Sequence, residues 1–139
     1  MDAKVTWKGK LAFEGVANSG FTIPLDTRIE NGGDSSGSSP MELVLVGLAG
    51  CTAMDVIDIL RKKRQEVTAF EVRVHGDRTT EHPQVFNHIQ VEYVITGHHI
   101  DPMAADRSVE LSASRYCSVQ AMLSKTAQVE HKVTLIEAV

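Results

Sequence analysis

The sequence has no excess of positive charge. Its 14 Lys and Arg residues are outnumbered by 18 Asp and Glu residues, which gives a formal net charge of −4. A protein that neutralises a run of nucleic-acid phosphates needs a broad basic surface. We therefore expect no nucleic-acid partner.

Long apolar segments are also missing. The longest uninterrupted apolar run, Leu43 to Cys51, is shorter than the roughly 20 residues that span a bilayer. Residues 1–10 have neither the apolar core nor the small-residue cleavage site of a signal peptide. We expect a cytoplasmic protein without a membrane partner. Its 139 residues, 42% of them hydrophobic, are enough for one core, so we expect a single domain over residues 1–139.

Motifs for metals and phosphates are absent as well. The six histidines form no ligand spacing with the cysteines, such as Cys-x-x-Cys or His-x-x-x-His. The adjacent His98 and His99 would point in opposite directions in an extended chain, so they should not hold one ion together. The glycine-rich stretch at 32–37 lacks the following lysine of a phosphate-binding loop. We expect no metal and no cofactor.

Cysteine is scarce, and Cys51 and Cys117 are the only two in the chain. In the cytoplasm such cysteines rest as thiols, so a disulfide between them would be transient. If their segments meet in the fold, the pair is a candidate peroxide-reducing dithiol. Otherwise each is a small buried hydrophobe, as free cysteine commonly is. The residues alone leave both interpretations open.

The alternation of polar and apolar residues predicts an α+β domain with the element order βββ, α, ββ, α, β. A flexible polar loop is expected at 30–39, and Pro24 should lie on an edge strand or at a bulge. The predicted strands are a three-stranded antiparallel meander at 4–8, 10–16 and 21–29, a hairpin of 67–79 with 84–96, and a last strand at 129–136. A second helical region is expected from Asp101 through Leu123.

The central helix has signals at both ends. Ser39 is the expected N-cap, Pro40 the first helical residue and Glu42 the acid of a capping box, while the basic run at 61–64 suits the C-terminal end. Such a helix is about 35 Å long. Because apolar residues fill every position from 43 to 48, we expect it to be buried on all sides, in part by a second subunit.

Cys51 lies about three turns into this helix, far from the N-terminal amides that lower a thiol pKa. A reactive thiolate there needs a cation, and Arg28, at the end of the third predicted strand, is the candidate. The alternative is that Arg28 is simply solvated. Cys117 is expected near a helix start, where amides favour its thiolate. Gly47 and Gly50, beside Cys51, predict the close approach of another helix or a substrate.

Several short motifs resemble one known family. They are Thr27-Arg28 with its glycine-rich loop, Ser39-Pro40-Met41-Glu42-Leu43, Gly47-Leu-Ala-Gly-Cys51 and Cys117-Ser-Val. In order and spacing they resemble the OsmC/Ohr family of osmotically inducible and organic hydroperoxide resistance proteins, nearly from end to end. The resemblance implies an OsmC-like fold and an intertwined homodimer, with the long helices at its centre and sheets built from strands of both chains. It also implies two active sites at the dimer interface.

Residue roles follow from the resemblance position by position. Family peroxidases use a peroxidatic cysteine, here Cys51, a resolving cysteine, here Cys117, and an arginine, here Arg28. Their glutamate directly follows the proline, ten positions before the cysteine, and Met41 occupies that place. Glu42 is one residue further on, about 100° around the helix, so it either substitutes for that glutamate or only caps the helix. Asp55 and Tyr116 are the other candidates to replace it.

Two classes of function remain. The resemblance implies a thiol-dependent peroxidase that reduces organic hydroperoxides in oxidative or osmotic stress and is regenerated by an external dithiol reductant. The alternative is a non-enzymatic protein that binds a small hydrophobic ligand on the same scaffold, since a fold does not establish an activity. Met41 favours the second class, whereas Arg28, Cys51 and Cys117 favour the first.

Overall fold

Two three-stranded sheets and three α-helices make up the protein, for which the computed structural model describes residues 1–139. The predicted α+β class is therefore confirmed. The chain divides into two units, Met1–Val44 and Leu45–Val139, and each is described by itself.

The N-terminal unit contains the predicted meander. Strands β1 (Ala3–Gly9), β2 (Ala12–Ala17) and β3 (Thr22–Leu25) pair antiparallel in the order β1-β2-β3. Pro24 lies on the edge strand β3, as predicted, where its missing amide costs no ladder hydrogen bond. Strand β3 ends earlier than expected because Asp26 turns away to accept hydrogen bonds from the following loop. Arg28 consequently precedes a short 3-10 turn, Ile29–Asn31, and is not at a strand end.

Helix α1 runs from Pro40 to Lys62, as its end signals predicted. The capping box is complete: the Ser39 amide donates to Glu42 Oε1 at 3.1 Å, and the Glu42 amide donates to Ser39 Oγ at 3.2 Å. Two of the otherwise unpaired groups at the helix start are thus satisfied reciprocally.

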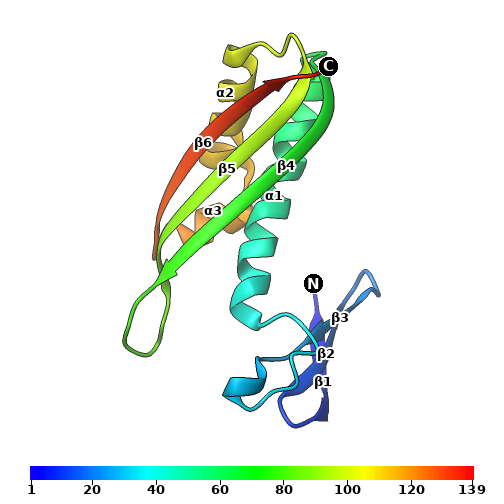
Figure 1. The fold of residues 1–139 in the computed structure, drawn as a ribbon, viewed down its shortest axis with the longest axis vertical. Helices are drawn as coiled ribbons and strands as arrows, with labels where there is room; N and C mark the ends of the chain where they lie inside the picture. The colour runs from blue at the N-terminus through cyan, green and yellow to red at the C-terminus, as the bar shows by residue number, and fades with distance from the viewer. The chain divides into compact units, whose positions relative to one another are not determined.

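The C-terminal unit is built on the second sheet. Strands β4 (Glu66–Arg78) and β5 (Phe86–His98) form the predicted hairpin, and β6 (Gln128–Glu137) pairs parallel with β5 in the order β4-β5-β6. The second helical region is interrupted. It consists of α2 (Pro102–Leu111), a π-helical turn (Ser112–Tyr116) and α3 (Ser118–Leu123). Within this unit the helices lie on one face of the sheet (Figure 1).

One stripe of α1 joins the core of this unit. Leu48, Thr52, Val56 and Leu60 follow one another at intervals of one helical turn, and each is fully buried. The other side of α1 is open, with Val46 63% and Met54 74% exposed. The expectation that α1 is buried on all sides is therefore wrong for the single chain, because the sheet covers only one face of the helix.

Helix α1 is also long and apolar enough to cross a membrane, with a mean hydropathy of 2.0 over its most apolar part. Core helices meet the same criterion, so length and composition are weak evidence. The helix packs its Leu48–Leu60 stripe on the sheet and carries Asp55, which is hydrogen-bonded to Ser112. These contacts are those of a helix packed against protein on one side.

The core stripe is testable by truncation. Leu60→Ala should lower the free energy of unfolding by about 2–5 kcal/mol, because it leaves a cavity between α1 and the sheet. Met103→Ala on α2, where the side chain is 79% exposed, is the control and should change it by less than about 0.5 kcal/mol. Urea denaturation of both variants measures the difference, and equal losses would contradict the assigned core.

Candidate thiol site

Cys51 sits at the margin of the buried face of α1. Its neighbour Thr52 is fully buried, whereas Cys51 itself is half-buried. A Cβ atom added at Gly47 or Gly50 would meet nothing within 4 Å. The crowding that these glycines predicted is thus absent within the chain, and the helix surface beside Cys51 is open.

Cys117 is held at the end of the π-helical turn. Its amide donates to the Ser112 carbonyl at 2.8 Å, which closes the wide turn, and it then caps α3. The Gln120 amide donates to Cys117 Sγ at 3.4 Å. The sequence contains no evident signal for this turn, although π-helical turns are frequent at functional sites.

The chemistry of Cys117 differs from the sequence-based expectation. Only 3% of the residue is exposed. Burial raises the pKa of its thiol to about 11, the Gln120 amide opposes this, and the neighbouring Cys51 and Asp55 raise it further. The predicted amide contact is present, but desolvation outweighs it, so Cys117 is a protonated thiol near neutral pH.

The structure brings the two cysteines together. The Cys51 thiol lies close enough to the Cys117 thiol to raise the pKa of the latter, and no disulfide joins them. The segments that carry them, α1 and the turn before α3, are far apart in the sequence. A half-buried thiol therefore faces a fully covered one.

A chain of hydroxyl groups lies beside this pair. Thr52 Oγ1 is 2.8 Å from both Tyr93 Oη and Ser112 Oγ, and Ser112 Oγ donates to Asp55 Oδ2 at 2.9 Å. Tyr93, Thr52 and Ser112 are fully buried. Burial raises the pKa of Tyr93 to about 12, so its phenol stays protonated and available as a donor.

The candidates for the missing glutamate have different surroundings. Asp55 is engaged by Ser112, within the hydroxyl chain. Tyr116 is 55% exposed. Neither side chain has an arginine as a hydrogen-bond or ion-pair partner in the chain.

Arg28 and Glu42 form a second group, in the N-terminal unit. Arg28 Nη1 lies 3.6 Å from Glu30 Oε1, and both side chains are largely exposed. Hydrogen bonds from Ser39 lower the pKa of Glu42, and the charge of Arg28 contributes in the same direction. Glu42 is therefore both the capping acid and an electrostatic neighbour of Arg28. The cysteines belong to the C-terminal unit, and the joining of the two groups into one site stays a prediction.

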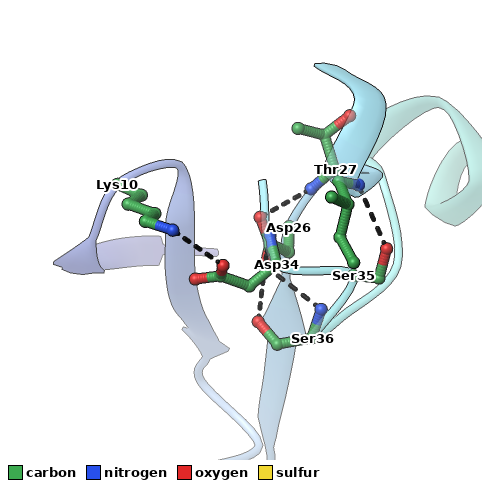
Figure 2. A network of polar contacts seen from close by, with 7 residues as sticks. Lys10, Asp26, Thr27, Asp34, Ser35 and Ser36 are labelled. Carbon is green, nitrogen blue, oxygen red and sulfur yellow. Dashed lines mark hydrogen bonds and ion pairs between the residues drawn. The ribbon is translucent and has the colours of Figure 1, made fainter. Parts of the chain in front are cut away.

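Asp26 organises the loop that carries Arg28. Its carboxylate accepts hydrogen bonds from the Thr27, Asp34 and Ser36 amides and from Ser36 Oγ, at 2.6–3.1 Å (Figure 2). Asp26 is only 3% exposed, and these bonds, that of the Ser36 hydroxyl first, lower its pKa to about 2. The polar loop is thus hydrogen-bonded around one carboxylate, a role that the sequence analysis missed.

The glycines of this loop have a steric purpose. A Cβ atom at Gly33 would lie 2.2 Å from the Thr27 carbonyl oxygen, and one at Gly37 would lie 2.5 Å from that of Pro24. Only glycine permits these backbone approaches. An aspartate followed by a short stretch rich in glycine and serine is the signal that could have identified the role of Asp26 in this loop.

Five of the six histidines lie beside a carboxylate or an aromatic ring, namely His75, His88, His98, His99 and His131. His88 lies 3.2 Å from Glu130, and His98 and His99 approach the same carboxylate, Glu137, at 3.9 and 3.8 Å. The prediction that His98 and His99 point apart is wrong, because His99 has a φ of 51° and leaves the extended conformation. No group of three or more metal-ligating side chains is arranged around a common point.

The fold and the motifs together define the class of protein. A family model described as "OsmC-like protein" matches residues 32–132. This is more than half of the chain, so the chain belongs to the OsmC-like family, as its motifs predicted. The match includes Glu42, Cys51 and Cys117, whereas Arg28 lies just before it.

Among individual relatives, Protein YhfA of Escherichia coli is 41% identical over 138 residues, which cover 99% of this chain and 100% of the relative. A solved hypothetical protein from Aquifex aeolicus is 28% identical with a TM-score of 0.87, covering 99% of this chain and 97% of that one. An organic hydroperoxide resistance protein OsmC from Legionella pneumophila is 16% identical with a TM-score of 0.71, covering 96% and 95%. This last likeness shows the fold alone.

The Asp26 loop should be sensitive to acid. The pKa of Asp26 is lower in the folded protein than its ordinary value of 3.8, so its stabilising effect is complete above about pH 4 and is lost as the pH falls through about 2. Asp26→Asn should therefore destabilise the protein near neutral pH, and the difference from wild type should shrink in acid. Urea unfolding between about pH 2 and pH 7 measures this.

Asp34→Asn is the matched control for that experiment, because the Asp34 carboxylate pairs with Lys10 on the surface at 3.0 Å and accepts nothing from the loop backbone. Its effect on stability should be small at every pH. An equal, pH-independent loss in both variants would contradict the role assigned to Asp26.

Proposed function

We propose that this protein is a thiol-dependent peroxidase that reduces organic hydroperoxides. The observation that carries the proposal is the proximity of the half-buried Cys51 thiol to the buried Cys117 thiol. Membership of the OsmC-like family supports it, and one structural relative bears the name organic hydroperoxide resistance protein.

The proposed reaction has two thiol steps. The Cys51 thiolate attacks the terminal peroxide oxygen: an S–O bond forms, the O–O bond breaks, and an alcohol leaves after protonation. The Cys117 sulfur then attacks the Cys51 sulfenic acid. An S–S bond forms, the S–O bond breaks, and the hydroxide leaves as water with the proton of the Cys117 thiol. An external dithiol restores both thiols, and the protein acts in the cytoplasm under oxidative or osmotic stress.

Arg28 is the proposed cation for the Cys51 thiolate, and Glu42 is the proposed partner that orients it. Their proximity in the N-terminal unit supports this pairing. An arginine beside a thiolate stabilises the ionised form that attacks peroxide. Glu42 takes the role of the glutamate that Met41 replaces.

A second copy of the chain is the proposed partner. Apolar side chains are left open on α1, at Val46 and Met54, and separately on the N-terminal unit, at Val5, Trp7, Phe21 and Ile23. Exposed apolar groups in this number mark an interaction surface. Family resemblance assigns that surface to an intertwined homodimer, and the open helix surface at Gly47 and Gly50 gives room for the partner or the substrate.

Binding of a small hydrophobic ligand is the second candidate function. A groove of about 480 Å³ in the N-terminal unit favours it, because its lining is mainly apolar: Val5, Leu11, Phe13, Leu25 and Pro40, with Asp26 and Thr27. Pockets of this size and character hold small ligands. The absence of rapid thiol chemistry would favour this function over the first.

Replacing one cysteine at a time distinguishes the reaction of Cys51 with peroxide from the later formation of the disulfide. After addition of cumene hydroperoxide, the wild type should lose both thiols and gain an intramolecular disulfide, whereas Cys117→Ser should stop at a sulfenic acid on Cys51. Cys51→Ser should react at least about a hundred times more slowly. Thiol titration, sulfenate trapping and mass spectrometry follow each product. A wild-type reaction no faster than that of free cysteine would exclude the peroxidase.

Two further variants test Arg28 and Glu42 in the same assay. Arg28→Met should slow sulfenate formation about a hundredfold, with partial recovery in Arg28→Lys. Glu42→Gln retains a side chain that caps a helix but loses the charge. It should slow the reaction about tenfold if Glu42 orients Arg28, and an unchanged rate would leave Glu42 only its capping role.

The homodimer is tested by charge at the open face of α1. Met54→Glu should weaken dimerisation at least about a hundredfold, because a carboxylate would be buried in an apolar interface. Met103→Glu on α2 is the control and should leave the dimer intact. Sedimentation velocity over a concentration series measures both, and a monomeric wild type would contradict the proposal.

A further inference from the structure

Four side chains of the C-terminal unit, three of them fully buried and one half-buried, have no role in the proposed thiol steps, although they lie near the cysteines. Tyr93, Thr52, Ser112 and Asp55 form one continuous hydrogen-bonded chain, with distances of 2.8, 2.8 and 2.9 Å between successive oxygens. They come from β5, α1 and the π-helical turn. No buried side-chain nitrogen or oxygen in the protein lacks a hydrogen-bond partner, so every buried oxygen of these four side chains is hydrogen-bonded.

The chain has a fixed direction. The Ser112 hydroxyl donates its one proton to Asp55, so it accepts from Thr52. The Thr52 hydroxyl then has no proton left for Tyr93, and it accepts from the phenol. Each of the three hydroxyls donates once, Thr52 and Ser112 also accept once, and hydrogen bonds aligned in this way strengthen one another.

Both cysteines are connected to these four hydrogen-bonded side chains. Thr52 directly follows Cys51 on α1. The Ser112 carbonyl accepts the Cys117 amide at 2.8 Å, so the residue whose hydroxyl bridges Thr52 and Asp55 also closes the turn that presents Cys117. The chain therefore fastens the Cys117 turn to the helix that carries Cys51.

A second connection reaches Cys117 from the other side. The His131 ring stacks on Tyr93 with their centroids 6.1 Å apart, and His131 Nε2 lies 2.9 Å from Gln120 Oε1. The Gln120 amide in turn donates to Cys117 Sγ. Tyr93 is thus the point from which both connections run, one to the backbone of Cys117 and one to its sulfur.

A buried polar network contributes little net stability compared with apolar groups of the same shape. Its effect is instead to select one arrangement, because any other leaves a buried hydroxyl or carboxylate without a partner, at a cost of about 1–3 kcal/mol. Here the selected arrangement is the one in which the two sulfurs meet.

We propose that Thr52, Ser112, Asp55 and Tyr93 are positioning residues that hold the Cys117 turn against α1 and thereby set the effective concentration of the Cys117 thiol at Cys51. The proposal rests on the cysteine pair of the proposed function and concerns its disulfide step. None of the four touches the peroxide; they act through the backbone of Cys117.

Equilibration with glutathione tests this without any peroxide. One oxidised glutathione takes two electrons from Cys51 and Cys117, which form a disulfide, and two reduced glutathiones and no other product result. The ratio of reduced to disulfide protein over a series of glutathione buffers gives the effective concentration. Thr52→Val and Ser112→Ala should lower it about tenfold or more, and Asp55→Asn should lower it as well.

Two matched variants separate positioning from general loss of stability. Thr52→Ser restores the hydroxyl and should stay within about twofold of wild type. Ser108→Ala removes another fully buried hydroxyl. This hydroxyl donates to the Ala104 carbonyl at 2.7 Å on α2 and takes no part in the hydrogen-bonded series from Tyr93 to Asp55. The substitution should destabilise the fold without changing the effective concentration.

The outcomes distinguish this inference from the peroxidase itself. Equal effective concentrations in wild type, Thr52→Val and Ser112→Ala would overturn the positioning role, as would an equal loss in Ser108→Ala. If Ser112→Ala does not fold, the pair Thr52→Val and Thr52→Ser decides. If the effective concentrations of the variants differ as expected but the wild type reacts slowly with cumene hydroperoxide, the positioning role is supported and the peroxidase is rejected.

Discussion

The packing of one face of α1 on the β4-β5-β6 sheet is the constraint on which the candidate site depends. Leu48, Thr52, Val56 and Leu60 repeat at one-turn intervals and are all fully buried, so the helix cannot rotate without exposing them. Because one residue is about 100° of rotation, this packing also fixes Cys51 at the margin of the buried face. A reactive group in that place is partly accessible, yet it remains next to groups of the core.

The two thiols consequently have unequal environments. Cys51 is half-buried beside an open helix surface, whereas Cys117 is covered and its pKa is raised, first by burial and then by Cys51 and Asp55. Two thiolates side by side would repel each other, so the arrangement favours ionisation of one sulfur at a time. In the proposed reaction, the half-buried Cys51 would therefore attack the peroxide first and the covered Cys117 would react second.

Local signals predicted the elements well. Ser39, Pro40 and Glu42 marked the start of α1 because a helix cap depends on neighbouring residues alone, and the alternation of the strands gave both antiparallel groups. The parallel pairing of β5 with β6 and the exposed side of α1 depend on distant segments, which single-sequence patterns do not encode. The hydroxyl chain was missed for the same reason, since Thr52, Tyr93 and Ser112 meet only after folding. The π-helical turn at Ser112–Tyr116 contains no residue type that distinguishes it from an ordinary helix in the sequence.

The position of His131 on β6 has a consequence for the order of events during synthesis. Strand β6 lies C-terminal to all other helices and strands of the chain, and it supplies the ring that stacks on Tyr93 and contacts Gln120. At about 5–20 residues per second, translation from Cys117 to the end of β6 takes about one to four seconds. A nascent chain therefore carries both cysteines before β6 is complete, and the surroundings of Gln120, whose amide donates to Cys117, are completed only when this last strand pairs with β5.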